Sequence, residues 1–377
     1  MLTINALRVD MKILFISRVK FGTMGSGALN WFPGYVQENG HDVKIVECLS
    51  AKSNEIIVDN PKFNLDVHEI NSNLLYEHLD AIFNIAESFE PDIFYVFGRA
   101  DIFDFVYHLR HRFIKTKIVI DIRSPLLIQD GEKKKLIENK FYKVQHYVDH
   151  INTCDLDSLR TYSNNIFKPV SVLPIGVNIS DFKVINKVNY EKLKKFVFIG
   201  SLYRKRHVDI LIKNFYSFSE SVKFDATLDI YGAGDAVKEL KDLIFNMSAH
   251  NIIKLNEALP QESLFQKLAD YDVGIAYVPY ELFSVAPSLK SIEYAAAGIP
   301  ILASDTQGHQ KYSRDHNFRF KLFSNDSPGF IKAFTEVYLN GFSSNDISAN
   351  HQAVQPFDWK NIVKYCLLPS LENHNNF

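Results

Sequence analysis

Short apolar runs alternate with longer helical stretches along nearly the whole chain. Most of the runs are continuously apolar rather than alternating, which is typical of parallel strands covered on both faces. The repeated strand–helix order predicts a doubly wound α/β architecture. The pattern predicts strands at Ile13–Ser17, Asp42–Glu47, Ile93–Phe97, Lys117–Asp121, His150–Thr153, Ser171–Leu173, Phe196–Gly200, Thr227–Tyr231, Ile252–Leu255, Val273–Tyr277 and Ile301–Ser304, with helices that include Asn73–Phe89, Val208–Phe218, Ala236–Ala249 and Glu262–Asp270.

A polar break with Pro and Gly interrupts this pattern in the middle of the chain, and "FVFIGSL" restarts it. The chain has 377 residues, a length that suits two domains at roughly 150 residues each. We expect an N-terminal Rossmann-like domain over 11–175, a linker over 176–190 and a C-terminal Rossmann-like domain over 191–355. Residues 1–10, which precede Met11, are expected to be an extension outside the fold. The last stretch, 356–377, is predicted to form a helix with an apolar stripe that crosses back to the N-terminal domain.

Composition narrows the class of protein. The formal net charge is −2, so no global bias towards nucleic acid exists. The three cysteines are far apart, which indicates a reducing, cytoplasmic compartment with no disulfide framework and no cysteine zinc site. No apolar run reaches the ~18 residues that span a bilayer, and the N-terminus lacks a signal-peptide pattern.

Ligands of open α/β sheets bind beyond the carboxyl ends of the strands, so the loops there are the candidate sites. In the N-terminal domain, the loop after the first strand holds Gly25, Ser26 and Gly27, which suit close backbone approach to an anion or simply a flexible turn. Asp121 and Arg123 end another strand, where they could hold an acceptor or pair with each other. "DLDSL" resembles a metal-binding DxD, but its position favours Asp155 as a helix N-cap.

In the C-terminal domain, "FIGSLYRKRHVDILI" places Arg204 and Arg206 between a strand and a helix, where cations suit a diphosphate or form a solvated turn. "IYGAGD" has Gly232 after a strand, a weak signal that often only permits a close turn. "SVAPSLKSIEYAAAGIP" predicts a helix with Ser288 as N-cap, ended by Gly298. Lys290 and the free N–H groups of the first turn suit phosphate, and Glu293 could accept hydrogen bonds from ribose. The alternative is an amphipathic helix on which Lys290 and Glu293 form an i,i+3 pair, which gives little reason for this particular arrangement.

Together these segments resemble the retaining glycosyltransferases of family 4, which have the GT-B fold of two Rossmann-like domains facing across a cleft. "PIGVN" resembles the linker motif P-x-G-V-D, and "SLKSIEYAAAGIPILASD" resembles the helix E-A-x-A-x-G-x-P-V-V-A-T of the P-x-L-K-x-x-E-Y subset. "FIGSLYRKRHVDILI", "IYGAGD" and "ALPQESLFQKLADYDVGI" also fit. The resemblance covers most of the C-terminal half, and in the N-terminal half it depends on "MKILFIS", the glycine loop and "ENGHDVKIV".

The resemblance implies a sugar transfer from a nucleotide-diphosphate-sugar to a hydroxyl, of hexosyltransferase type, with retention and without metal or other cofactor. It assigns catalytic roles to Arg206, Lys290, Asp121 and Arg123. It assigns nucleotide-sugar contacts to Gly25, Ser26, Gly27, Ser201, Arg204, Arg206, Gly232, Ala258, Leu259, Pro287, Ser288, Leu289, Lys290 and Glu293. Two positions depart from the family pattern: Val285 stands where the first Glu of E-x7-E falls, and Ser201 replaces an Arg.

The implied acceptor is a glycan or a polyprenyl-linked saccharide, in cell-surface polysaccharide or lipopolysaccharide assembly. Two other functions stay open: a nucleotide-sugar epimerase of the same fold, and a non-catalytic nucleotide-binding partner subunit. The run "GEKKKLIENKFYK" either forms a solvated helix face or contacts anionic lipid at the inner face of the membrane. The lysines that would make this peripheral contact are Lys133, Lys134, Lys135, Lys140 and Lys143.

Overall fold

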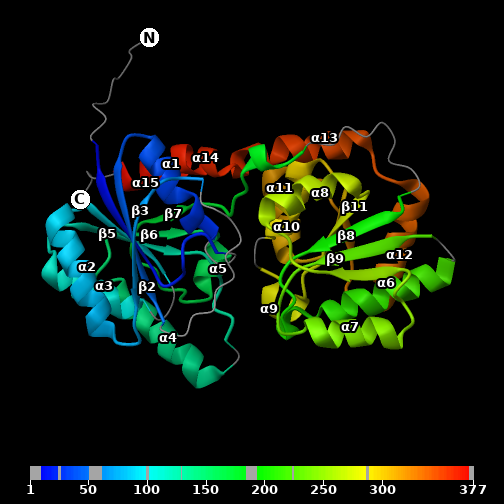
Figure 1. Ribbon diagram of the computed structural model, residues 1–377, viewed down its shortest axis with the longest axis horizontal. Helices are drawn as coiled ribbons and strands as arrows, with labels where there is room; N and C mark the ends of the chain where they lie inside the picture. The colour runs from blue at the N-terminus through cyan, green and yellow to red at the C-terminus, as the bar shows by residue number, and fades with distance from the viewer. Residues whose placement is uncertain are drawn as a thin grey trace, which may run out of the picture. The chain divides into compact units, whose positions relative to one another are not determined.

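A computed structural model gives the structure of the chain, and it describes residues 10–23, 27–50, 62–98, 102–128, 130–183, 193–222, 225–285 and 288–372. The chain divides into two compact units (Figure 1). Unit 1 comprises Met1–Ile175 together with Trp359–Phe377, and unit 2 comprises Gly176–Asp358. The prediction for residues 1–10 falls almost entirely outside the described residues.

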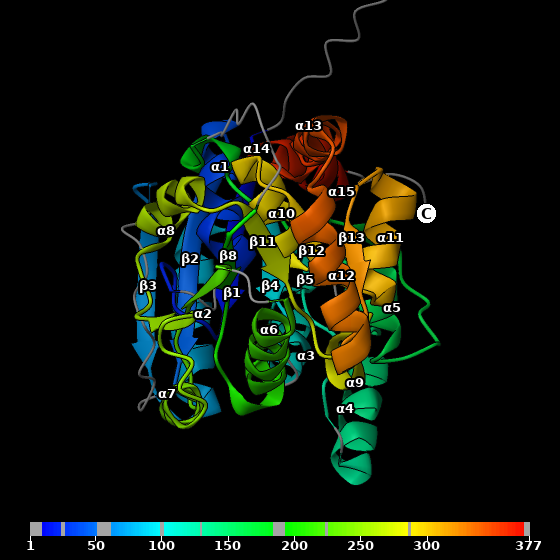
Figure 2. The ribbon, with the colours of Figure 1, turned by 90° about the vertical axis from the view of Figure 1, so that its right-hand side faces the viewer.

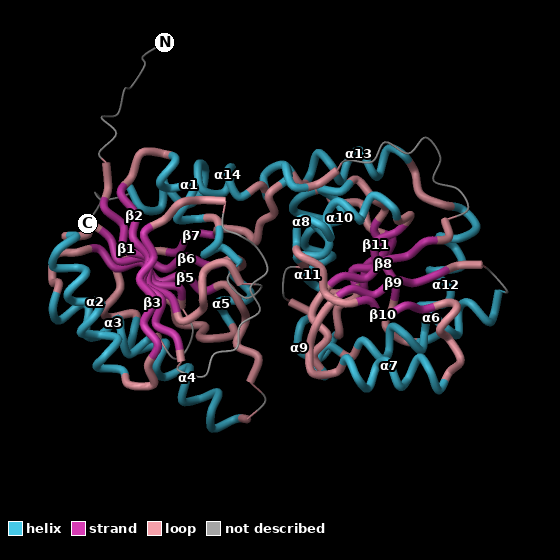
Figure 3. The backbone as a smooth tube through the Cα atoms, in the orientation of Figure 1, coloured by secondary structure: helices cyan, strands magenta, loops and turns pink. Residues whose placement is uncertain are grey.

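Unit 1 is built on a parallel sheet with the strand order β3-β2-β1-β4-β5-β6-β7. The chain order reverses between β1 and β4, which is the switch point of a doubly wound fold. The strands are β1 (Lys12–Ser17), β2 (Asp42–Leu49), β3 (Asp66–Asn71), β4 (Ile93–Phe97), β5 (Lys117–Ile122), β6 (His150–Thr153) and β7 (Val170–Val172). In Figure 3 they form one sheet between helices.

Each face of this sheet has its own apolar core. The first core includes Leu14, Phe94 and Phe105, and it is covered by α2 (Leu75–Phe89), α3 (Phe103–Arg112), α4 (Gly131–Val144) and α5 (Leu156–Arg160). The second core joins Phe15 and Tyr95 to α1 (Phe32–Glu38) and to the end of the chain, which forms α14 (Trp359–Ile362), a π-helix (Val363–Leu367) and α15 (Leu368–Glu372). The predicted C-terminal stripe is buried here at Trp359, Ile362, Val363 and Leu367.

Unit 2 is built on a second parallel sheet, with the order β10-β9-β8-β11-β12-β13. Its switch point lies between β8 and β11. The strands are β8 (Lys195–Ile199), β9 (Thr227–Tyr231), β10 (Ile253–Asn256), β11 (Val273–Ala276), β12 (Ile301–Ser304) and β13 (Lys321–Phe323). A phenylalanine-rich core of Phe196, Phe215, Phe218 and Phe334 lies under α6 (Val208–Val222) and α12 (Ser327–Asn340).

The remaining helices of unit 2 are α7 (Val237–Asn246), α8 (Gln261–Lys267), α9 (Tyr280–Phe283), α10 (Leu289–Ala297), α11 (Gln307–His316) and α13 (Ser344–Ala353). Figure 2 shows α12 beside β13. The eleven predicted strands are confirmed to within one or two residues at their ends. The prediction missed β3 and β13, which lie at sheet edges and are partly exposed.

Candidate functional site

The candidate site lies at the carboxyl edge of the sheet of unit 2, beside the switch point. β8 ends at Ile199, and Gly200 follows with φ of 150° in the region that favours glycine. The helix α10 belongs to the loop region that follows β11 at the same edge. A Cβ atom added to Gly200 would lie 3.8 Å from the Lys290 Nζ, so the backbone after β8 passes close to the first turn of α10.

The loop after β9 packs tightly against the loop after β8. Gly200 N–H donates to the Tyr231 carbonyl (3.0 Å), and Leu202 N–H donates to the Ala233 carbonyl (2.8 Å). A Cβ atom at Gly232 would overlap the carbonyl oxygen of Gly200. Gly232 therefore permits the close approach of two loops. This agrees with the interpretation of the G-x-G as a close turn rather than as a ligand-binding motif.

Two side chains of α10 fix this helix to the sheet. The Tyr294 hydroxyl accepts a hydrogen bond from Ile199 N–H at 3.1 Å, at the end of β8. Ser291 Oγ lies 2.8 Å from Nε2 of His309, whose Nδ1 lies 2.7 Å from the Ser304 carbonyl oxygen. The carbonyl accepts the Nδ1 proton, so Nε2 is left as acceptor. Burial lowers the pKa of His309 to about 4, which keeps the imidazole neutral.

Lys290 and Glu293 stand one turn apart on α10, and no hydrogen bond or ion pair joins either of them to the described residues. The Glu293 side chain is buried, with 7% exposed. Burial raises the pKa of Glu293 to about 7, while the charge of Lys290 opposes that shift. Burial, helped by the charge of Arg206, lowers the pKa of Lys290 to about 8. The charged form of each side chain is therefore less favourable here than it is in water.

Arg206 brings a third charge to this edge of the sheet. It closes a 3₁₀ turn, Arg204–Arg206, and its guanidinium carbon lies 3.8 Å from the ring centroid of Phe283. Its Nε is buried with no hydrogen-bond partner among the described residues. Burial lowers the pKa of Arg206. A buried guanidinium nitrogen without an acceptor is costly, and an anion would satisfy it.

Ser288 occupies the predicted N-cap position of α10, and Gly298 ends the helix with φ of 71°. The Ser288 side chain does not cap the helix, however, because its buried Oγ has no hydrogen-bond partner among the described residues. Leu289 follows and is exposed. The prediction for Pro287 lies outside the described residues.

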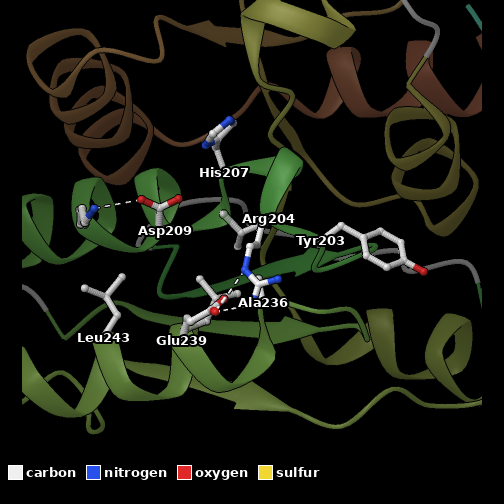
Figure 4. Close-up of a pocket in the computed structure, with 10 residues that line it drawn as sticks. Tyr203, Arg204, His207, Asp209, Ala236, Glu239 and Leu243 are labelled. Atoms are coloured by element: carbon white, nitrogen blue, oxygen red, sulfur yellow. Dashed lines mark hydrogen bonds and ion pairs between the residues drawn. The ribbon is translucent and has the colours of Figure 1, made fainter. Parts of the chain in front are cut away.

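Arg204 lies apart from this group. Its guanidinium forms ion pairs with Asp235 (3.3 Å) and Glu239, both from the segment after β9. With Tyr203 and His207 it lines an open hollow of about 410 Å³ between α6 and α7 (Figure 4). The structure thus separates Arg204 from Arg206, although the sequence placed both at one anion site.

The remaining predicted contacts of unit 2 lie on loops at the carboxyl edge. Ser201 follows Gly200 directly and is partly exposed. Ala258 and Leu259 follow β10, with Ala258 exposed and Leu259 partly exposed. The Ser201 hydroxyl makes no hydrogen bond to the described residues, and Ala258 and Leu259 have apolar side chains that can only offer van der Waals contact to a ligand.

In unit 1, Asp121 and Arg123 are held by other protein groups. Asp121 is fully buried and accepts a hydrogen bond from the Tyr95 hydroxyl at 2.7 Å. Burial raises the pKa of Asp121, and the nearby Arg123 opposes that shift. Arg123 donates to the carbonyls of Leu173 (2.7 Å) and Pro174 (2.9 Å), and its Nη1 lies 3.7 Å from Asp121. This geometry favours the ion pair that fixes a loop over contact with an acceptor.

The glycine loop of unit 1 is described only in part. Gly25 and Ser26 lie outside the described residues, whereas Gly27 opens a 3₁₀ turn with φ of 42°. Asp155 is confirmed as a helix N-cap, because its side chain accepts from Ser158 N–H at 3.0 Å. Its carboxylate is therefore engaged in starting α5.

The sequence reasoning missed three residues of the site: Phe283, which stacks on Arg206, and Tyr294 and His309, which support α10. Tyr294 stands in the "SIEY" segment directly after Glu293, so its position was visible. Phe283 and His309 carry no motif signal. The site as a whole offers two cations, one carboxylate and a helix start, a set that suits a diphosphate beside a group rich in hydroxyls.

Part of unit 2 matches the model of a known protein family. Residues 193–340, which are less than half of the chain, match the family described as glycosyl transferases group 1. A curated relative from Limosilactobacillus reuteri subsp. suis, the GtfA subunit of a UDP-N-acetylglucosamine–peptide N-acetylglucosaminyltransferase, is 24% identical over 252 residues. That match covers 61% of this chain and 46% of the relative, so the chain spans about half the length of the curated relative.

Solved structures match nearly the whole chain. Anabaena HepE in complex with UDP has a TM-score of 0.71 at 16% identity, covering 96% of this chain and 99% of HepE. The pneumococcal O-GlcNAc transferase GtfA, in complex with UDP and GlcNAc, has a TM-score of 0.71 at 12% identity, covering 97% and 100%. The predicted fold is confirmed: the chain has the two parallel α/β units of GT-B glycosyltransferases.

Proposed function

We propose that this protein is a glycosyltransferase that moves a sugar from a nucleotide-diphosphate-sugar to a hydroxyl acceptor. The observation that carries the proposal is the group at the carboxyl edge of β8. There Arg206 Nε and Ser288 Oγ are buried with no hydrogen-bond partner among the described residues, and the charges of Lys290 and Glu293 lie close by. Buried groups of this kind are normally satisfied by a partner. A nucleoside diphosphate satisfies them all, since its phosphates accept from the cations and its ribose donates to the carboxylate.

The same residues suit the chemistry of transfer. As the bond between the anomeric carbon and the phosphate oxygen breaks, negative charge develops on the leaving diphosphate. Arg206, Lys290 and the start of α10 would stabilise that charge electrostatically. Two fixed cations supply the positive charge, so the proposal assigns no metal and no other cofactor.

We infer a retaining transfer from the family resemblance. The acceptor oxygen attacks the anomeric carbon on the face that the phosphate leaves, and a phosphate oxygen of the leaving group takes the acceptor proton. The acceptor proposed is a glycan or a polyprenyl-linked saccharide, in polysaccharide or lipopolysaccharide assembly. HepE and the pneumococcal GtfA were solved with UDP, which makes UDP the first nucleotide to test.

A thermal-shift screen of the whole chain with UDP, GDP, ADP and CMP, with and without Mg²⁺, tests the nucleotide site. A ligand at 100 times its dissociation constant adds about 2.7 kcal/mol to the free energy of unfolding. We expect one nucleoside diphosphate to stabilise the protein without Mg²⁺. The Lys290→Ala variant should lose that response, and Arg204→Ala, a control outside the group, should keep it.

Turnover then separates the possible functions. A transferase releases free nucleotide from the matching nucleotide sugar only as sugar reaches an acceptor or water. An epimerase would alter the sugar with no acceptor present, and a non-catalytic subunit would bind nucleotide without turnover. A protein that no nucleoside diphosphate stabilises would contradict the proposal.

We also propose a peripheral contact between α4 and an anionic lipid surface. Of its lysines, Lys140 is paired with Asp104 (2.8 Å) and Lys134 lies 3.8 Å from Glu138. Lys133, Lys135 and Lys143 are exposed, and Leu136 between them is 57% exposed. Exposed cations around an exposed leucine suit a negatively charged membrane surface, at about 1 kcal/mol per lysine. Among the described residues, no helix is both long and apolar enough to cross a bilayer.

Sedimentation with vesicles tests this contact. We expect binding to vesicles that contain phosphatidylglycerol and not to pure phosphatidylcholine, with weaker binding at high salt. Alanine at Lys133, Lys135 and Lys143 should abolish it. The matched control carries alanine at three exposed lysines of unit 2, Lys238, Lys241 and Lys254. Equal loss in both variants would show that net charge, not α4, governs the binding.

A further inference from the structure

The two cations of the site are held by aromatic rings rather than by carboxylates. The guanidinium carbon of Arg206 lies 3.8 Å from the centroid of Phe283, and the Lys290 Nζ lies 5.4 Å from the centroid of Phe198. Both phenylalanines are buried, and Phe283 is only 4% exposed. A ring face attracts a cation without accepting its N–H donors in the plane. Each cation is therefore placed while its hydrogen-bonding edge stays open.

Arg204, two residues before Arg206, is an arginine held by carboxylates instead of by an aromatic ring. Its guanidinium is bound by the carboxylates of Asp235 and Glu239. Those carboxylates neutralise the charge and occupy the N–H donors, so Arg204 is poorly suited to receive a phosphate. The difference between the two arginines lies in the partner that each one meets.

Phe283 is itself fixed in place by its neighbours. It ends the short helix α9, and the next residue, Ser284, accepts a hydrogen bond at its carbonyl from Gly308 N–H at 2.8 Å. At the other end of α9, the Tyr280 hydroxyl accepts from Asn325 N–H at 3.3 Å. The short helix that carries Phe283 is thus tied at both ends to the segments that follow β12 and β13.

We propose that Phe283 is a positioning residue that holds the Arg206 guanidinium ready for the diphosphate of the nucleotide. This inference rests on the proposed function and adds a residue to it. An arginine side chain is long and has several rotatable bonds, and stacking limits the orientations of its planar fork. Without the ring, Arg206 would sample orientations in which its donors do not face the phosphates.

Calorimetric titration of Phe283→Leu with UDP and with uridine tests the inference. A cation–π contact of this kind corresponds to a change of about 3- to 30-fold in affinity. We expect the Kd for UDP to rise by that factor and the Kd for uridine to stay unchanged, because uridine has no phosphates. Phe283→Tyr, which keeps the ring face, should restore the affinity for UDP.

A double-mutant cycle with Arg206→Ala shows whether Phe283 acts through the arginine. In the Arg206→Ala background, Phe283→Leu should cause no further loss of UDP affinity. An equal loss in both backgrounds, or a parallel loss of uridine affinity, would overturn the inference in favour of a general packing role. If Phe283→Leu does not fold, Phe283→Met keeps the apolar volume and serves in the same cycle.

The outcomes separate this inference from the proposed function. A wild-type protein that binds a nucleoside diphosphate with unaltered affinity after Phe283→Leu would overturn the positioning role alone. A wild-type protein that binds none of UDP, GDP or ADP would overturn both. If the wild type prefers GDP or ADP, that nucleotide replaces UDP in the double-mutant cycle and its nucleoside replaces uridine.

Discussion

Lys290 makes the affinity for a nucleoside diphosphate depend on pH. Burial, together with the charge of Arg206, lowers its pKa to about 8. The terminal phosphate is already ionised above its pKa of about 6. Glu293, with a pKa of about 7, also loses its proton in this range, but in the proposed site it serves the ribose, so the lysine is the group that changes charge beside the diphosphate. The bound diphosphate favours the charged ammonium, and deprotonation above pH 8 therefore weakens binding.

The size of the effect follows from that pKa. About nine-tenths of the lysine is charged at pH 7 and about one-tenth at pH 9, so the Kd should rise about tenfold between these values. Calorimetric titration with UDP, in buffers of equal ionic strength, measures the change. The Lys290→Arg variant stays charged over the whole range and should show a nearly flat profile.

The pH profiles of the Kd for the wild type and for Lys290→Arg together test whether Lys290 is the titrating group. A wild-type Kd that is constant from pH 7 to pH 9 would show that Lys290 is fully charged throughout or lies away from the diphosphate. A tenfold rise that persists in Lys290→Arg would assign the titration to another group. Either result would show that Lys290 does not titrate near pH 8 beside the diphosphate.

Three further predictions concern the supports of the site. Glu293→Ala should weaken UDP and uridine alike, by about 10- to 100-fold in titration, because the carboxylate serves the ribose; loss for UDP alone would contradict this role. Gly232→Ala should lower the free energy of unfolding by about 1–3 kcal/mol in denaturant, since its Cβ would overlap the Gly200 carbonyl; an unchanged midpoint would contradict the close approach. His309 has a folded pKa of about 4 against about 6.5 unfolded, so the unfolded chain binds more protons between these values and stability falls as the pH falls. The wild type should lose about 3 kcal/mol more than His309→Gln between pH 6.5 and pH 4, and equal losses in denaturant unfolding would refute a buried neutral imidazole.

The central strands of both sheets were predictable because burial on two faces requires continuous apolar runs. β3 and β13 lie at sheet edges, as do β7 and β10, which were predicted, so edge position alone does not explain the two misses. β3, "DVHEIN", is half-exposed and carries charges, and β13 has only three residues. Their pairing depends on neighbours distant in the sequence, such as Lys44 opposite Asp66, rather than on local hydrophobicity.

The candidate site was predictable where its residues share one short segment. Lys290 and Glu293 stand one turn apart, and the helix periodicity alone places them together. The different surroundings of Arg204 and Arg206 were not predictable, because their partners lie on other segments of the chain. Asp235 and Glu239 bind Arg204, and Phe283 contacts Arg206. Side-chain direction in the turn after β8 is a tertiary property, which local spacing does not encode.

In the proposed function, the carboxyl edge of unit 2 binds a nucleoside diphosphate through Arg206 and Lys290. The most direct measurement is calorimetric titration of UDP, GDP and ADP into three proteins: the wild type, the Arg206→Ala/Lys290→Ala double variant and the Arg204→Ala control. We expect one nucleotide to bind the wild type and the control with equal affinity and to bind the double variant at least about 100-fold more weakly. Equal affinity in all three proteins, or no binding to the wild type, would contradict it.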